Sequence, residues 1–395
     1  MHIAHFSNTY LPIINGVVRS VSSFRKALTE LGHNVFVFAQ QQNDYQDMEP
    51  FIFRYPSIFP PVDMDLPLVI PISSNIDWII PILKLDVIHT HHPILVGQAA
   101  ANKAEELQLP LVFTVHSRYR EYINYAPFSQ DAVQGFLKSA VYNWMEDFMR
   151  RCTHLVIPSE SVLDILIEDY GLESGYTVIP TGIDLEPYRA ADGDKIRAEM
   201  GWEGDWVVIS TGRLSVDKNW SVLIKAFAQV AEQYPNSRLV ILGGGMEKDN
   251  LEELAANLGV GQQVQLLGFV PYDQVPGYLK AADIFSFSSV IETQGLVTME
   301  ALAAGLPVVA VNASGTRDIV SHGQQGLLVE EDPQALAQGI CRLRQDEGLF
   351  RAMSQAALAR AQDFEMKTLA GKLVGVYERA MEDKKGGNPV RFAKS

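Results

Sequence analysis

Residues 283–311 read DIFSFSSVIETQGLVTMEALAAGLPVVAV, and they show the pattern on which the whole chain is built. Two short apolar runs, DIFSF and PVVAV, flank a helical run that ends at Gly305, and Pro307 opens the second apolar run. Strands this apolar are buried on both faces, as in parallel sheets that helices cover. The segment therefore predicts a strand, a helix and a second strand of an α/β domain.

The same alternation runs through the chain in two successive series. The first series of predicted strands is IAHFS, NVFVFAQ, DVIHTH, LVFTVHS, HLVIPS and TVIP, and the second is WVVISTG, RLVILGGG, VQLLGFV, DIFSFSS, PVVAV and GLLVE. A chain of 395 residues also exceeds what a single core usually supports. The sequence therefore predicts two Rossmann-like, doubly wound α/β domains.

Glycine, proline and aspartate residues indicate the expected domain boundaries. Residues 1–185 form the predicted N-terminal domain and 186–365 the C-terminal domain, and the segment 181–205 is the expected linker. A C-terminal helix is expected over 366–381, and the tail 382–395 is expected to be disordered.

Composition restricts the class of function. The formal net charge of −15 opposes binding to nucleic acid, which needs a basic surface. Cys152 and Cys341 are far apart and lack metal-ligand spacing, which favours a reducing, cytoplasmic setting. No uninterrupted apolar run is long enough for a membrane span, and no secretory signal is visible.

Glu292 and Glu300 are the acids that first suggest a ligand site. Eight residues of ideal helix advance about 12 Å and turn about 80° beyond two full turns, so two acids at this spacing neither touch nor share a face. We expect a loop that carries Glu292, then a helix that begins near Gly295 and carries Glu300. The exposed N–H groups of that helix start would favour an anion. An elongated, anionic, hydroxyl-rich ligand such as a sugar nucleotide fits this arrangement.

Other candidate residues lie where ligands bind in doubly wound sheets, in the loops that follow the strands. Asn15-Gly16 follows the first strand and precedes a helix, so Gly16 could face a phosphate, although the pair also reads as a capped turn. Arg213 and Lys218 follow the first strand of the second series and could converge on a pyrophosphate, or form a solvated surface pair. Phe269, followed by Val270, could form the wall of a nucleobase site or be a buried aromatic side chain.

Histidines gather at the ends of two predicted strands. His89 and His91 share a strand face and could in principle bind a metal, but no Cys or clear Glu partner accompanies them, so no metal is expected. His116 ends the next strand beside Arg118 and Tyr119, which suits substrate binding, while a structural histidine is the alternative.

Taken together, these residues resemble the family 4 retaining glycosyltransferases of GT-B fold. The resemblance rests on Glu292 and Glu300 with seven residues between them, the Arg213 to Lys218 loop, the IPTGID segment and the Asn15-Gly16 loop, and it spans about residues 1–380. It implies two Rossmann-like domains that face each other across a cleft, with a C-terminal helix that crosses back to the first domain. It also implies a nucleotide-sugar donor and no required cofactor.

The resemblance implies the following roles for residues of this chain. Arg213 and Lys218 would bind the donor pyrophosphate and stabilise the leaving group, and Gly16 would reach the phosphate. Glu300 would bind the ribose and Glu292 the donor hexose, and His116 would lie beside the transferred sugar. The remaining donor contacts would come from Thr293, Gln294, Gly295, Leu296, Phe269 and Val270, and the acceptor side would hold Asn15, His91, His116, Arg118 and Tyr119.

The implied reaction is hexose transfer with retention, by front-face attack in which the departing phosphate accepts the proton of the acceptor. The stretches ETQGLVTMEALAAGLPVVA and DVIHTHHPILVG resemble the branch that transfers glucose from UDP-glucose to diacylglycerol. A peripheral membrane contact is then expected through residues 58–82, with Trp78, or through the helix at 132–151. A soluble sugar or sugar-phosphate acceptor, a nucleotide-sugar epimerase and a binding protein without turnover are the alternatives.

Overall fold

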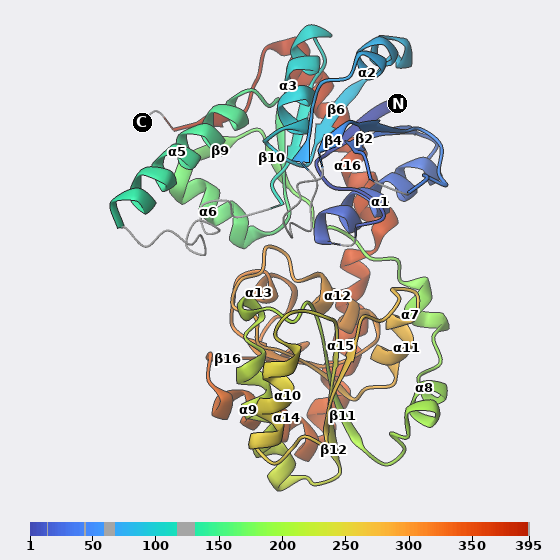
Figure 1. Cartoon of the computed structure of the whole chain (residues 1–395), viewed down its shortest axis with the longest axis vertical. Helices are drawn as coiled ribbons and strands as arrows, with labels where there is room; N and C mark the ends of the chain where they lie inside the picture. The colour runs from blue at the N-terminus through green and yellow to red at the C-terminus, as the bar shows by residue number, and fades with distance from the viewer. Residues whose placement is uncertain (14, 43–44, 59–67, 117–130, 394–395) are drawn as a thin grey trace. The chain divides into compact units, whose positions relative to one another are not determined.

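The computed structural model divides into two compact units, residues Met1–Gly182 with Met366–Ser395 and residues Ile183–Glu365 (Figure 1). It describes residues 1–13, 15–42, 45–58, 68–116 and 131–393. Each unit is a parallel sheet with helices on both faces, so the predicted α/β class is confirmed.

The N-terminal unit contains strands and helices in alternation. Its strands are β1 (His2–Ser7), β2 (Asn34–Gln40), β3 (Ile52–Tyr55), β4 (Ser57–Ile58), β5 (Leu68–Val69), β6 (Val87–Thr90), β7 (Leu111–Thr114), β8 (His154–Ile157), β9 (Leu172–Ser174), β10 (Tyr176–Val178) and β17 (Arg391–Phe392). Its helices are α1 (Gly16–Glu30), α2 (Ser74–Ile79), the 3₁₀ turn η1 (Ile80–Leu83), α3 (Val96–Glu106), α5 (Asp131–Arg150), α6 (Glu160–Tyr170) and α16 (Met366–Gly386).

The main sheet of this unit has the strand order β10-β8-β7-β6-β1-β2-β3 among the described residues. The chain begins in the middle with β1, adds β2 and β3 on one side, and then crosses to add β6 on the other side of β1. The order therefore reverses between β1 and β6. In open parallel sheets, a reversal of this kind leaves adjacent strand-end loops without a helix between them, and ligands bind there.

Helix α16 covers one face of this sheet although it is far away in the sequence. Its side chains Leu369, Leu373 and Tyr377 are buried against Ile3 of β1 and Val112 of β7. Helix α1 lies beside it on the same face. The C-terminal segment thus supplies part of the core of the N-terminal unit.

The C-terminal unit repeats the arrangement. Its strands are β11 (Trp206–Thr211), β12 (Ser237–Leu242), β13 (Val264–Gly268), β14 (Ile284–Phe287), β15 (Val308–Val311) and β16 (Gly326–Val329). Its helices are α7 (Glu186–Ala190), α8 (Gly193–Met200), η3 (Val216–Lys218), α9 (Trp220–Gln233), α10 (Lys248–Asn257), α11 (Val275–Lys280), α12 (Leu296–Ala303), α13 (Thr316–Ile319), α14 (Pro333–Gln345), α15 (Glu347–Ala361) and η4 (Gln362–Phe364).

The sheet of the C-terminal unit has the order β13-β12-β11-β14-β15-β16, so its reversal lies between β11 and β14. All side chains of β11, β14 and β15 are buried, which explains why these strands read as continuous apolar runs. The opening segment 283–311 is the β14, α12, β15 part of this sheet, as its pattern predicts.

Two expectations about the segment boundaries were wrong. The chain from 382 to 393 is not a disordered tail, because α16 continues to Gly386 and β17 pairs antiparallel with β9, where Phe392 is buried. Residues 183–205 are not a free linker, because α7 and α8 belong to the C-terminal unit and Trp202 is buried in its core. The polar and glycine-rich composition of these two segments gives no local signal of order. Each segment is held in place by one or two buried aromatic side chains.

Candidate active site

The candidate site of the C-terminal unit lies where the strand order reverses. The loop after β11 carries Arg213 and Lys218, and the loop after the neighbouring strand β14 carries Glu292. The Ser288 hydroxyl, at the end of β14, donates to the backbone carbonyl of Lys218 over 3.0 Å. This hydrogen bond joins the two loops directly.

An ion pair between these two loops forms the centre of the site. Lys218 Nζ lies 2.7 Å from Glu292 Oε1 and 3.4 Å from a carboxylate oxygen of Asp217. Burial alone would lower the pKa of the Lys218 ammonium, but the two carboxylates outweigh it, so the pKa is raised above its ordinary value. Lys218 therefore remains a fixed positive charge in a mostly buried position.

Arg213 has a fixed backbone, and its largely exposed side chain donates to the Ser215 hydroxyl over 3.3 Å. The buried indole of Trp220 donates to the Arg213 carbonyl over 2.9 Å, while the guanidinium lies 3.8 Å from Asp217 and is largely exposed. Burial raises the pKa of Asp217, but the Ser215 hydroxyl and the two cations outweigh it and lower the pKa. An anionic ligand would therefore meet a mostly buried cation, Lys218, and an exposed cation, Arg213.

Glycines bring the strand-end backbones of this site into contact. A Cβ on Gly243 would lie 1.9 Å from the carbonyl oxygen of Gly212, and one on Gly245 would lie 2.2 Å from that of Leu214. The LGGG run after β12 is thus required for the loop that carries Arg213 to pack closely. Gly243 and Gly245 therefore have a structural role in this loop.

The loop that carries Glu292 leads into the start of α12, as predicted. Gly295 adopts a left-handed conformation with φ of 69°, and no side chain caps α12 among the described residues. A Cβ on Gly315 would lie 2.7 Å from Glu292 Cβ, so the loop before α13 packs tightly on Glu292. The uncapped N–H groups of α12 begin at Leu296, four residues after Glu292, and they favour an anion.

The remaining predicted donor residues fall on the same strand ends. Glu300 is in the middle of α12 and only 2% exposed, whereas Phe269, which follows β13, is 67% exposed and so is not a buried aromatic. Val270 is half-buried beside it. The residues before and at the start of α12 are partly or fully buried, namely Thr293, Gln294, Gly295 and Leu296.

Two predicted residues of the N-terminal unit form a helix start. The Asn15 side chain accepts from Val18 N–H over 2.9 Å and caps α1, which begins at Gly16. The capped-turn interpretation of this pair is correct for Asn15, because its side-chain oxygen is engaged by its own helix. Arg118 and Tyr119 lie outside the described residues.

The predicted histidines form one cluster, in which His89 and His91 are buried and His116 is partly buried. His116 Nε2 lies 2.9 Å from His91 Nδ1, and His91 Nε2 lies 2.9 Å from His5 Nδ1. Both ring nitrogens of His91 are therefore engaged by neighbouring histidines. The ligand atoms of His5, His89 and His91 lie within 4.8 Å of one another, close enough to hold a metal ion.

Sequence reasoning missed several residues of these two sites. His5 faces His89 in the register of β1 with β6, a pairing that needs the strand order. Tyr377 reaches the same cluster from α16, almost three hundred residues further along the chain. The alternate spacing of His89 and His91, with His116 at the end of the next strand, was the local signal for this cluster.

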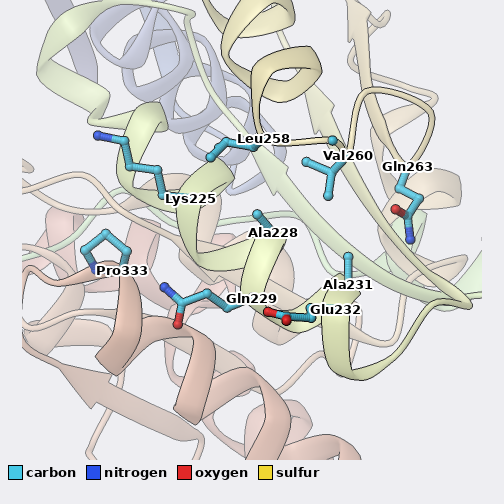
Figure 2. Close-up of a pocket in the computed structure, with 10 residues that line it drawn as sticks. Lys225, Ala228, Gln229, Ala231, Glu232, Leu258, Val260, Gln263 and Pro333 are labelled. Carbon is cyan, nitrogen blue, oxygen red and sulfur yellow. The ribbon is translucent and has the colours of Figure 1, made fainter.

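A separate hollow lies on the helical side of the C-terminal unit (Figure 2). It has a volume of about 630 Å³ and is bordered by α9, by the loop after α10 and by Pro333, with Lys225 at one end. Its lining contains none of the candidate site residues, and we assign no ligand to it.

Comparison with known proteins gives the family. The family model for Glycosyltransferase Family 4 matches residues 14–187, and that for Glycosyl transferases group 1 matches residues 192–360. The chain is 31% identical to the alpha-monoglucosyldiacylglycerol synthase of Streptococcus pneumoniae, over 83% of this chain and 75% of the relative. It is 28% identical to the enzyme of the same name from Acholeplasma laidlawii, over 95% and 96%.

Solved structures agree with the fold. Anabaena HepE in complex with UDP and glucose superposes with a TM-score of 0.76 at 21% identity, covering 96% of this chain and all of that one. Two Rossmann-like units with this topology define a glycosyltransferase of the GT-B class. The chain belongs to family 4 of these glycosyltransferases, as its sequence motifs predict.

In the described part of the chain, no helix is both long enough and apolar enough to cross a membrane.

The buried histidines make a prediction about acid stability. Burial lowers the pKa of His5 and His116 to about 3, and the pKa values of His89 and His91 lie well below the ordinary 6.5. The unfolded chain therefore binds more protons below pH 6.5, so each histidine should reduce the unfolding free energy by about 1.4 kcal/mol per pH unit there. Hydrogen exchange of β1 and β6 should accelerate between pH 7.5 and 5.5, after correction for the intrinsic rate.

The C-terminal unit is the internal control, because its only histidine is the exposed His322. Corrected exchange of β11 and β14 should change much less over this range. The same pH dependence in both units would contradict the burial of neutral histidines.

Proposed function

We propose that this protein transfers glucose from UDP-glucose to diacylglycerol, with retention at the anomeric carbon. The observation that carries the proposal is the buried Lys218 and Glu292 pair at the strand-order reversal of the C-terminal unit, beside the uncapped start of α12. This arrangement offers a cation and backbone donors to a diphosphate and a carboxylate to sugar hydroxyls. HepE, whose fold is similar, is described in complex with UDP and glucose.

In the proposed donor site, Lys218, Arg213 and the N–H groups at Gly295 and Leu296 bind the diphosphate. Glu292 already accepts from Lys218 through one oxygen, which leaves its other oxygen for a hydroxyl group of the hexose. Glu300 binds the ribose and Phe269 stacks against the base. Thr293, Gln294 and Val270 supply further donor contacts through their backbones.

The proposed reaction needs no nucleophile from the protein. The bond from the anomeric carbon to the phosphate oxygen breaks, the acceptor oxygen attacks the same face, and the departing phosphate takes the acceptor proton. Negative charge grows on the leaving phosphate, where Lys218 and Arg213 stabilise it. In this proposal Glu292 positions Lys218 through one oxygen and binds the hexose through the other, and it is not used as an acid.

The N-terminal unit supplies the acceptor side in this proposal. His116 contacts a hydroxyl group of the substrates, and the start of α1 at Gly16 offers backbone donors to a phosphate. Asn15 contributes by fixing that helix start. Two alpha-monoglucosyldiacylglycerol synthases among the relatives support a lipid acceptor.

A sugar-phosphate acceptor is the second candidate within the same chemistry. The chain is 33% identical, over 76% of its length, to the D-inositol 3-phosphate glycosyltransferase 1 of Catenulispora acidiphila. Both acceptors present a hydroxyl to the same donor, so the Lys218 and Glu292 pair does not separate them. The acceptor has to be tested directly.

An exposed apolar surface supports contact with a lipid bilayer. Ile72, Trp78 and Ile82 are 74%, 72% and 56% exposed and lie on or beside α2 and η1. Aromatic and aliphatic side chains of this kind insert into the interfacial region of a membrane. The alternative surface on α5 is less suitable, because Phe148 is buried in the core.

Two substitutions test the donor site. Lys218→Ala and Glu292→Gln should each lower the turnover of UDP-glucose at least about tenfold, because each removes a charge of the buried pair. Turnover is measured as UDP released in the presence of acceptor, and thermal melting verifies folding. Lys225→Ala, in the separate hollow, is the matched control and should keep the wild-type rate, whereas wild-type rates in all three variants would refute the site.

An acceptor screen tests the reaction. Purified protein is incubated with UDP-[¹⁴C]glucose and either diacylglycerol in mixed micelles or inositol 3-phosphate in solution, and label is counted after phase separation. We expect label in the lipid phase, with an α-linkage in the product. Label confined to the aqueous products would replace diacylglycerol by a soluble acceptor, and UDP-sugar conversion without either acceptor would indicate an epimerase.

Vesicle binding tests the membrane contact. The double variant Trp78→Ser with Ile82→Ser should bind phosphatidylcholine vesicles containing diacylglycerol about tenfold more weakly, because two apolar side chains no longer insert. Cosedimentation measures the bound fraction. Ile167→Ser, a partly exposed position on α6 of the same unit, is the control, and equal binding of all three proteins would exclude this surface.

A further inference from the structure

A continuous chain of hydrogen bonds runs through the buried histidines of the N-terminal unit. At one end, the Thr114 hydroxyl lies 2.7 Å from His89 Nε2, and His89 Nδ1 lies 2.7 Å from the Tyr377 hydroxyl. The same hydroxyl lies 3.3 Å from His5 Nε2. Tyr377 is fully buried, and burial raises the pKa of its hydroxyl, so it keeps its proton.

The chain continues from His5 to His116. His5 Nδ1 lies 2.9 Å from His91 Nε2, and His91 Nδ1 lies 2.9 Å from His116 Nε2. Burial lowers the pKa of each of these rings far below 6.5, so all of them are neutral at ordinary pH. Within the described residues, His116 Nδ1 has no hydrogen-bond partner.

Neutral rings in one chain have coupled tautomers. A neutral imidazole has one N–H donor and one acceptor nitrogen, and each hydrogen bond needs one of each. The buried Tyr377 hydroxyl must also donate its single proton to one of its two ring partners, so choosing the direction of one bond fixes every other bond. Only two arrangements satisfy the whole chain, one with all protons directed toward His116 and one with all directed toward Thr114.

The distances at Tyr377 favour the second arrangement. Hydroxyl groups donate over shorter distances than N–H groups do. The 2.7 Å contact with His89 therefore suits the donated hydroxyl, and the 3.3 Å contact with His5 suits an N–H donor from the ring. His5, His91 and His116 then all carry their protons on Nε2.

A metal ion is the competing explanation for the cluster. His5, His89 and His91 are close enough to bind one, but the ring nitrogens already pair with each other, with Tyr377 and with Thr114. The hydrogen-bond chain accounts for both ring nitrogens of all three residues. A divalent cation bound only by neutral rings would also be buried without an anionic ligand.

We propose that Tyr377 sets the tautomer of His116 through this chain, so that His116 presents an unprotonated Nδ1 as the acceptor for a substrate hydroxyl. Tyr377 is a positioning residue, because it acts only through His5 and His91. The role of His116 toward the hydroxyl rests on the proposed transferase function. The tautomer itself does not, because it follows from contacts within the unit.

Nuclear magnetic resonance of protein with ¹⁵N-labelled histidine rings measures the tautomer directly. His116→Asn identifies the His116 signals. We expect unprotonated Nδ1 and protonated Nε2 for His116, with nitrogen-to-nitrogen couplings across the two hydrogen bonds of His91. A protonated Nδ1 on His116, or a stoichiometric metal ion in the purified protein, would overturn the proposal without any further variant.

Tyr377→Phe removes the hydroxyl and keeps the ring in the core. The His116 signals should then shift toward a mixture of both tautomers, because the far end of the chain no longer selects one. Tyr55→Phe is the matched control, since Tyr55 is another buried tyrosine of the same unit with no histidine contact in the described chain, and it should leave the signals unchanged. Unchanged His116 signals in Tyr377→Phe would refute the coupling.

Kinetics then connects the tautomer with turnover. In Tyr377→Phe, kcat should fall about tenfold while KM for UDP-glucose stays within about twofold, because the donor site is intact. Tyr55→Phe should match the wild type. A shifted tautomer with unchanged kcat would overturn the role of His116 Nδ1, whereas a wild-type protein that transfers no glucose would refute the proposed function and leave the spectroscopic result standing.

Discussion

The reversal of strand order within each parallel sheet is the constraint on which both sites depend. A parallel sheet that grows from its middle strand must send its crossover helices to opposite faces, and the loops on either side of the reversal then adjoin each other. In the C-terminal unit these loops follow β11 and β14, and they bring Lys218 to Glu292. In the N-terminal unit, the neighbours β1 and β6 bring His5 to His89.

The two sites differ in charge, although both lie at a reversal of strand order. In the C-terminal unit, a buried lysine keeps its charge because two carboxylates compensate the cost of burial. In the N-terminal unit no carboxylate of the described residues accompanies the histidines, so burial keeps them neutral and hydrogen bonds engage their nitrogens. In the proposed function, the charged site binds a diphosphate and the neutral chain accepts from a hydroxyl group.

Close packing of backbone explains why so many glycines surround Lys218 and Glu292. Gly212 and Gly243 touch where a side chain would collide with a carbonyl oxygen, and Gly315 packs against Glu292 in the same manner. These contacts fix the loops so that the ion pair forms at hydrogen-bond distance. Rigid loops of this kind hold charges in place before a ligand arrives, which is the condition for electrostatic catalysis.

The sequence by itself determined the two α/β units, most strand positions, the start of α12 at Gly295 and the motifs that identify the family. Local apolar runs, glycines and acids carry those signals, because they reflect backbone geometry and burial within a few residues. It also suggested Lys218 and Glu292 as separate residues, but not as a pair, and it suggested His89 and His91 without His5 or Tyr377. Only tertiary structure decided those contacts, since they join strands and helices that strand order and the return of α16 bring together. The ordered end of the chain was missed for the same reason, because two buried side chains, Val390 and Phe392, hold it against the N-terminal unit.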